Sequence, residues 1–113
     1  MQIVRVSAAY KEGGHSHQDY KLVLVCGIDK QRKVVAGEWM GYAQNGTIYY
    51  PFIFKANEPS EFLYGGEENY SEPTNLSRAT IEAGALFTVF NPEDETPAWE
   101  STYEIVSFHA YVG

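Results

Sequence analysis

The first residues of the chain alternate between apolar and polar positions. In residues 2–10, Val4, Val6 and Ala8 fall on one face of an extended segment, while Arg5 falls on the other face. A period of two residues is typical of a β-strand with one face against a core and the other in water. The pattern therefore predicts a first strand over residues 2–10.

The next two segments differ in polarity. Residues 11–19 are polar and contain Gly13 and Gly14, which favours a long and mobile loop. Residues 20–28 are apolar at nearly every position, the pattern of a central strand covered on both faces. We expect Cys26 in this strand to be a small, inert, buried residue rather than a nucleophile.

A hairpin is predicted in the middle of the chain. Residues 33–42 predict a third strand and residues 47–54 a fourth. Asn45 and Gly46 form the dipeptide that most strongly indicates a type I′ turn, because both residues accept a positive φ. Pro51 cannot donate a ladder hydrogen bond, so the fourth strand is predicted to lie at a sheet edge or to carry a bulge.

The regular pattern breaks down in residues 55–83. Prolines and paired glycines interrupt residues 55–74, where we expect an irregular insert with a single helical turn over residues 57–64. Residues 76–83 place apolar side chains at helical spacing before a glycine, which favours a short helix.

The last part of the chain predicts a second hairpin, with strands over residues 85–90 and 99–112. In its second strand the larger apolar residues change face, from Tyr103 and Ile105 to Val106 and Phe108. A change of phase within one strand marks a bulge, as happens where a strand turns a barrel corner.

These elements together predict a mainly β fold in which residues 1–113 form a single domain. Six strands in mostly neighbouring order fit a small antiparallel barrel or roll of SH3-like size, with one or two short helices. A two-sheet β-sandwich is the alternative, because strand count and alternation alone barely separate the two architectures.

Composition narrows the protein class. The chain has 44% apolar and 20% charged residues, a globular composition, and a single cysteine, which allows no internal disulfide. It lacks both a signal-peptide pattern at its start and an apolar stretch of 18 residues, so we expect a cytoplasmic protein without a membrane partner. The net charge of −7 argues against a nucleic-acid partner, since affinity for phosphates requires clustered Lys and Arg.

The negative charge is unevenly distributed along the chain. Residues 1–57 hold seven basic and four acidic residues, a net of +3, whereas residues 58–113 hold eleven acidic residues and one basic residue, a net of −10. The acids concentrate in two predicted loops, and these loops are expected to attract a basic partner. The loop acids singled out for binding are Glu67, Glu68, Glu93, Asp94 and Glu95.

Histidines provide one candidate for metal chemistry; calcium at the acidic loops is another, but the EF-hand ligand pattern is absent. His15, His17 and Asp19 are spaced two apart, and with His109 they could ligate zinc or iron. A glycine-led loop is a poor rigid template, so exposed histidines are the favoured interpretation, and we expect no metal and no cofactor. The chain also lacks the Gly-x-Ser-x-Gly and Gly-rich phosphate-loop patterns, which favours a non-enzymatic role.

Aromatic residues offer a second type of site. They gather on and beyond the central hairpin, where rigid amphipathic rings are typical of a binding interface, although the same rings could instead fill the barrel. The candidate binding residues are Trp39, Tyr42, Tyr49, Tyr50 and Tyr64.

Three functional hypotheses follow from the sequence. The leading one is a small acidic protein-binding module, such as a bacterial or phage inhibitor, immunity-type or accessory factor, that recognises a basic protein through the aromatic patch and the acidic loops. The second is a small-molecule-binding or hydrolytic β-barrel with a His-lined site in its mouth. The third is a DNA mimic that presents its carboxylates in place of phosphates. Homo-oligomerisation is compatible with each.

Overall fold

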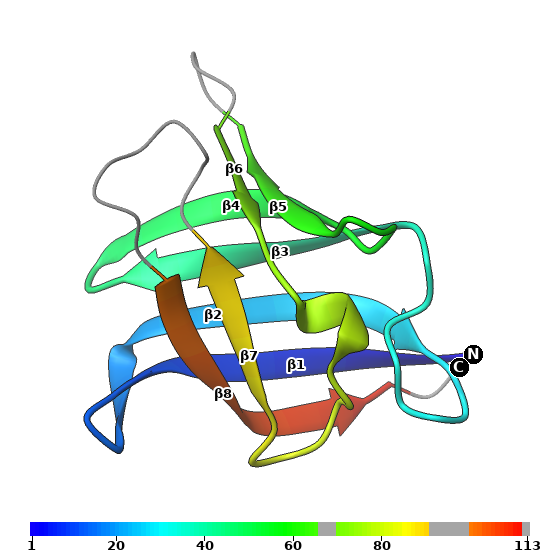
Figure 1. The fold of residues 1–113 in the computed structure, drawn as a ribbon, viewed down its shortest axis with the longest axis horizontal. Coiled ribbons are helices and arrows are strands. Elements are labelled where there is room, and N and C mark those ends of the chain that lie inside the picture. The colour runs from blue at the N-terminus through cyan, green and yellow to red at the C-terminus, as the bar shows by residue number, and fades with distance from the viewer. Residues whose placement is uncertain (66–69, 91–99, 112–113) are drawn as a thin grey trace.

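The computed structural model describes residues 1–65, 70–90 and 100–111, and these residues form eight antiparallel strands (Figure 1). A single three-residue 3₁₀ turn, η1, accompanies the strands, so the prediction of a mainly β fold is confirmed. The elements are β1 (Gln2–Glu12), β2 (His15–Ile28), β3 (Glu38–Asn45), β4 (Ile48–Lys55), β5 (Glu61–Tyr64), β6 (Tyr70–Pro73), η1 (Leu76–Arg78), β7 (Leu86–Phe90) and β8 (Glu100–Ala110).

All eight strands belong to one sheet with the order β6-β5-β4-β3-β2-β1-β8-β7. An isolated bridge between Thr74 and Val89 brings the two ends of this order together, so the sheet curls into a nearly closed barrel. Each strand then lies beside its neighbours along the chain, which is the up-and-down arrangement. The barrel-like architecture is confirmed, whereas the six-strand count and the two-sheet sandwich are wrong.

The strand count differs because residues 55–74 are not an irregular insert. They contain β5 and β6, which are only four residues each and therefore too short to show a clear period of two. Phe62 in β5 is fully buried and pairs with Phe54 of β4. The helical turn predicted over residues 57–64 is therefore wrong, because cross-strand burial decides the local conformation.

The short helix predicted over residues 76–83 is also wrong, apart from the 3₁₀ turn η1 within it. After η1 the chain crosses the end of the barrel through bends and a turn. The amide of Ile81 donates to the carbonyl of Arg32 at 2.8 Å, and the Ile81 side chain is fully buried. Burial against the barrel end outweighs the weak helical spacing of this segment.

The predicted mobile loop over residues 11–19 is instead the tip of a hairpin. Gly13 and Gly14 adopt φ values of 59° and 82°, which suits a two-residue turn, and Glu12 pairs with His15 across it. The polarity of this segment reflects its exposure beyond the core rather than an absence of strand structure.

The central hairpin forms with a different turn from the one predicted. Gly46 has a φ of 62°, but neither Asn45 nor Thr47 has a positive φ, so Gly46 and Thr47 are the central residues of the turn. A positive φ at the first central residue alone is typical of type II′. The hairpin is confirmed, and the type I′ turn is wrong.

Pro51 does not force β4 to a sheet edge. This strand lies between β3 and β5, and its pairing with each is regular. The proline is tolerated because β5 pairs only with Phe52 to Lys55, so that side of β4 has no described partner strand at Pro51. The predicted edge is therefore correct only locally, and the predicted bulge is wrong.

The bulge predicted in the last strand is confirmed. Ile105 pairs with Ala8 of β1, and Ser107 pairs with Ser7, so Val106 is the extra residue between them. The extra residue returns Phe108 to the inward face, where it packs against the core. The phase change in the sequence thus records a real break in the β1–β8 ladder.

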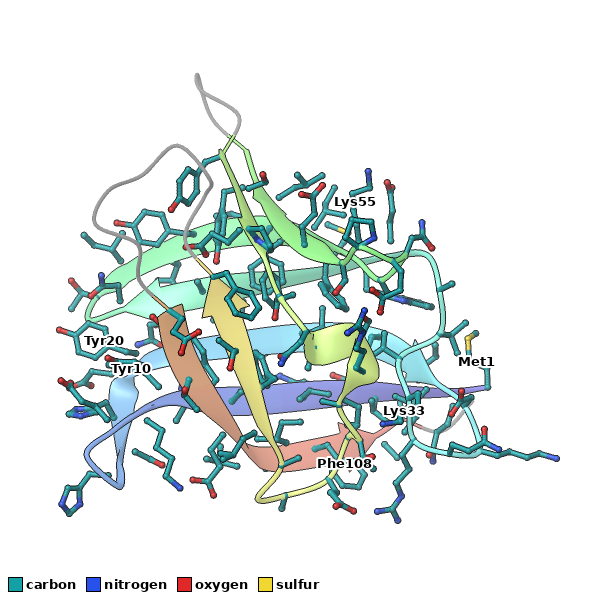
Figure 2. All side chains as sticks on the ribbon, in the orientation of Figure 1. Met1, Tyr10, Tyr20, Lys33, Lys55 and Phe108 are labelled. Carbon is teal, nitrogen blue, oxygen red and sulfur yellow. The ribbon has the colours of Figure 1, made fainter. Side chains whose placement is uncertain are left out.

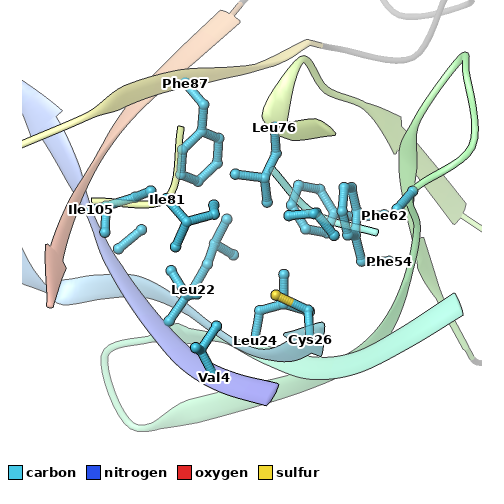
Figure 3. Packing of buried hydrophobic residues seen from close by; sticks show 14 of the residues in the cluster. Val4, Leu22, Leu24, Cys26, Phe54, Phe62, Leu76, Ile81, Phe87 and Ile105 are labelled. Carbon is cyan, nitrogen blue, oxygen red and sulfur yellow. The ribbon is translucent and has the colours of Figure 1, made fainter. Parts of the chain in front are cut away.

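The barrel interior is packed along most of its length. Large side chains of neighbouring strands pack together there, among them Phe54 of β4 and Phe62 of β5, whose ring centroids are 5.0 Å apart (Figure 3). Leu76 and Ile81 enter from the connection between β6 and β7 and close one end. No described segment crosses the opposite end of the barrel, and the candidate site lies there.

Candidate functional site

Tyrosines line the open end of the barrel, which we call the mouth. In an up-and-down barrel the odd-numbered strands end, and the even-numbered strands begin, at the same end. Figure 2 shows Tyr10 and Tyr20 there, with Met1 at the opposite end. The mouth tyrosines, each from a different strand, are Tyr10, Tyr20, Tyr50, Tyr64, Tyr70 and Tyr103.

A cavity of about 430 Å³ opens at the mouth. An eight-stranded barrel is wide enough either to be filled by side chains or to hold one small ligand. This volume falls in the range of small-molecule sites, about 300–1,000 Å³. The cavity is lined by Tyr20, Lys21, Ala43, Gln44, Asn45, Tyr50, Tyr64, Gly65, Tyr70, Glu72 and Tyr103.

Packing against core rings fixes two of these tyrosines. The Tyr103 ring stacks on Phe87 with centroids 5.6 Å apart, and the Tyr64 ring meets Phe52 edge-on at 5.7 Å. Tyr64 also lies 6.0 Å from the ring of Tyr70 across the β5–β6 pair. The walls of the cavity are therefore held by the hydrophobic core beneath them.

Glu72 is the carboxylate of the described cavity lining. It pairs with Phe62 across the β5–β6 ladder, and Phe62 points into the core, so Glu72 shares the inward face. The hydroxyl of Tyr70 donates to Glu72 Oε2 at 3.3 Å. A partly buried negative charge is thus placed against a wall of aromatic rings.

Burial keeps two mouth tyrosines protonated well above neutral pH. Loss of contact with water, followed by the negative charge of Glu72, raises the pKa of Tyr103 to about 12. The pKa of Tyr64 is raised further, first by burial and then by the charge of Glu72. Both hydroxyls are therefore neutral at physiological pH and can donate as well as accept a hydrogen bond.

The structure divides the predicted aromatic cluster into three places. Trp39 packs at the closed end, where its Nε1 donates to the carbonyl of Val35 at 2.8 Å. Tyr42 and Tyr49 lie on the outer face, with ring centroids 5.5 Å apart. Tyr50 and Tyr64 line the mouth cavity, so these are the two candidates that the fold brings into one site.

The acids singled out for binding lie outside the described residues: Glu67, Glu68, Glu93, Asp94 and Glu95. Of the described acids in this part of the chain, Glu58 contacts Arg78 Nε at 3.2 Å. Glu61 pairs with Lys55 at the β5 end opposite the mouth. Glu72 is at the mouth itself.

The histidines do not form a metal site with a third ligand in the described residues. His17 lies near the mouth, with Nε2 3.9 Å from Glu12 Oε2, and its ring is 5.7 Å from that of Tyr10. His109 pairs with Arg5. The described residues contain no group of three His, Cys, Asp or Glu side chains that could hold a metal ion.

Cys26 lies in the core with no exposed surface, as the sequence predicted. Burial raises the pKa of its thiol to about 12, so the thiolate that nucleophilic chemistry requires is suppressed at neutral pH.

The tyrosine mouth carried a signal in the sequence that periodicity alone did not reveal. Tyr64 ends β5 and Tyr70 begins β6, while Tyr10 and Tyr20 lie in the halves of β1 and β2 that are nearer the mouth. If β5 and β6 had been assigned as strands, grouping the tyrosines by the end of the barrel at which they lie would have placed these residues in one site. The predicted aromatic cluster contained both Tyr49 and Tyr50, which lie on opposite faces of β4 because they are adjacent in the strand.

Comparison with known proteins assigned no family. Neither family models, nor curated proteins, nor solved structures gave a match to this chain. Within the described residues, none of the helical structure has the length and hydrophobicity needed to span a bilayer.

Proposed function

We propose that the protein binds a small organic molecule in the tyrosine-lined mouth of its barrel. The observation that carries this proposal is the cavity of about 430 Å³ between Tyr20, Tyr50, Tyr64 and Tyr103. Rigid rings on a packed core provide apolar contact area, and their hydroxyls provide polar groups that orient a ligand.

A cavity-filling variant tests the proposal. Ala43 lines the cavity and pairs with Leu22, so Ala43→Phe directs a ring into the space that a ligand would occupy. We expect 2-phenylethanol, a neutral aromatic probe, to shift the NMR signals of Tyr50 and Tyr64 saturably in the wild type. The same titration should give no saturable shift in Ala43→Phe.

Met40→Phe is the matched control, because Met40 is exposed on the outer face of the same strand. It should retain probe binding. Equal binding by the wild type and a folded Ala43→Phe variant would contradict the proposal, as would probe-induced shifts confined to the outer face.

A second candidate, recognition of a basic protein, is supported by exposed side chains on the outer face. Tyr49 is 58% exposed beside Tyr42, and Met40 is 73% exposed. Together with the net charge of −7, this surface suits a partner that combines apolar and basic groups.

This second candidate predicts that one salt-sensitive partner captured by the wild type is lost with Tyr49→Ala. Ala43→Phe should capture that partner normally, because its ring points into the barrel. Retention of the partner by Tyr49→Ala would eliminate the outer face as its binding surface.

A further inference from the structure

The charge pattern of the mouth selects for one class of ligand. Building on the small-molecule function proposed above, we infer that the ligand is an organic cation, whose ammonium group lies between tyrosine ring faces and the carboxylate of Glu72. Three features of the mouth point to this ligand: the tyrosine rings, the placement of Glu72 and the position of Lys21, the one lysine in the described lining.

Tyrosine rings surround the cavity on several sides. Tyr20, Tyr50, Tyr64 and Tyr103 come from four different strands and border one cavity. The face of an aromatic ring carries partial negative charge, and a cation within about 6 Å of the ring centre is attracted to it. Several tyrosines around one space are a known means of recognising ammonium groups.

Glu72 adds a negative charge to the cavity lining. It shares the inward face of the barrel with Phe62. Its charge contributes to the raised pKa of Tyr64 on β5 and also of Tyr103 on β8, so its field reaches across the cavity. A ligand anion would be repelled throughout this space, and a ligand cation would be stabilised.

Lys21 does not reverse this preference. It also borders the cavity, but the neighbouring Leu22 points into the core, so Lys21 starts from the outer face of β2. An anion bound to this ammonium group would sit at the rim, away from the ring faces. The interior of the mouth keeps its negative character.

Three probes that differ mainly in charge test the inference. Phenethylamine, 2-phenylethanol and phenylacetate share a benzyl group and have similar sizes, but at pH 7 they are positive, neutral and negative. By calorimetric titration at low salt, we expect the amine to bind at least tenfold more tightly than the alcohol. The carboxylate should bind more weakly than the alcohol.

Glu72→Gln removes the charge with little change in side-chain size. We expect this variant to weaken amine binding at least fivefold and to leave alcohol binding within twofold. Glu104→Gln is the matched control, because Glu104 is a partly buried carboxylate of β8 whose Oε1 contacts Lys11 Nζ at 3.3 Å outside the cavity. It should leave both affinities unchanged.

The outcomes separate the inference from the function on which it rests. Equal affinity for the amine and the alcohol in the wild type overturns the cation assignment. This comparison uses the wild type alone, so it does not depend on whether Glu72→Gln folds. An unchanged preference for the amine in folded Glu72→Gln also overturns it. Binding of the probes that survives Ala43→Phe, or no binding by any probe, instead overturns the proposed function.

Discussion

Among the described glycines, Gly41 is the one whose surroundings leave least room for a side chain. It lies in β3 between Leu24 of β2 and Phe52 of β4. A Cβ atom at this position would meet the carbonyl oxygen of Val23 and, at 2.9 Å, the ring of Phe52. Because backbone blocks one side and a buried ring the other, the wall can relieve the clash only by moving a strand.

Gly41→Ala should therefore lower the free energy of unfolding by about 1–3 kcal/mol, the usual cost of overpacking a core. Urea denaturation would show this as a lower midpoint with an unchanged slope. Gly65→Ala is the control, since nothing lies within 4 Å of a Cβ there. Equal stability of the two variants would contradict the close approach at Gly41.

Alkaline pH should destabilise the fold. Burial raises the pKa of Cys26 from 9.0 and that of Tyr103 from 10.0, each to about 12. At a pH between the ordinary pKa and the raised pKa, the folded chain keeps protons that the unfolded chain has released. The free energy of unfolding therefore falls as pH rises from about 9 to about 12. Urea midpoints measured from pH 8 to pH 11 should decline steadily.

Tyr103→Phe tests the contribution of the tyrosine to this decline. The variant lacks the group that ionises on unfolding, so its stability should fall less steeply than that of the wild type above pH 10. Parallel slopes for the two proteins would show that the Tyr103 hydroxyl is not protected from ionisation.

At the scale of elements, the junction of β6 and β7 closes the barrel with few ladder contacts. Side-chain hydrogen bonds reinforce it. Thr74 Oγ1 donates to the carbonyl of Thr88 at 2.7 Å and accepts from the amide of Leu76 at 3.2 Å, while Asn75 Oδ1 accepts from the amide of Thr88 at 2.7 Å. Closure thus depends on a few named polar groups.

Thr74→Val keeps the shape of this buried residue but removes both of its side-chain hydrogen bonds. We expect a loss of about 1–3 kcal/mol, because a buried amide and a carbonyl lose a partner. Amide hydrogen exchange in β7 should accelerate. Thr47→Val, in the exposed turn between β3 and β4, should change neither quantity, and unaltered exchange in β7 of Thr74→Val would argue against the closing role.

Long alternating segments were predictable from sequence, and short ones were not. Residues 2–10 and 99–112 are long enough for period two to be evident, and even the bulge at Val106 left a readable change of phase. β5 and β6 have four residues each, between prolines and glycines that suggest a loop. β5 takes its strand conformation from pairing with β4, and β6 from pairing with β5. These are tertiary effects that local propensity does not contain.

The site was less predictable than the fold for a related reason. Its residues are far apart in the sequence, and only strand order brings Tyr20 near Tyr64 and Tyr103. Of the predicted aromatic cluster, Tyr50 and Tyr64 reached a common cavity, while Tyr49 lies on the other face of β4. Knowing which face of its strand each residue occupies does not locate the mouth unless the strand order is also known.

At the scale of the whole molecule, the two ends of the barrel have different tasks. Leu76 and Ile81 fill the closed end, whereas the mouth tyrosines surround open space. The hydrophobic core between them supports the mouth walls. Stability and ligand binding should therefore respond separately to substitutions at the two ends.

Ile81→Ala tests this separation. Truncating a fully buried isoleucine should cost about 2–5 kcal/mol of unfolding free energy, through lost burial and a residual cavity. Below the new unfolding transition, the variant should bind 2-phenylethanol within twofold of the wild type. A loss of binding by the folded variant would show that the closed end controls the mouth.

The pairing of β1 with β8, in which Val4 meets Ala110, has a consequence for how the barrel assembles. Most other ladders join strands adjacent along the chain and can zip up locally, but this one must close a loop of nearly the entire polypeptide, at a high entropic cost. Until the β7–β8 hairpin docks, a curled sheet of the first six strands exposes the backbone of β1 and β6. This partly folded form, rather than the complete barrel, is therefore the state that is prone to self-association.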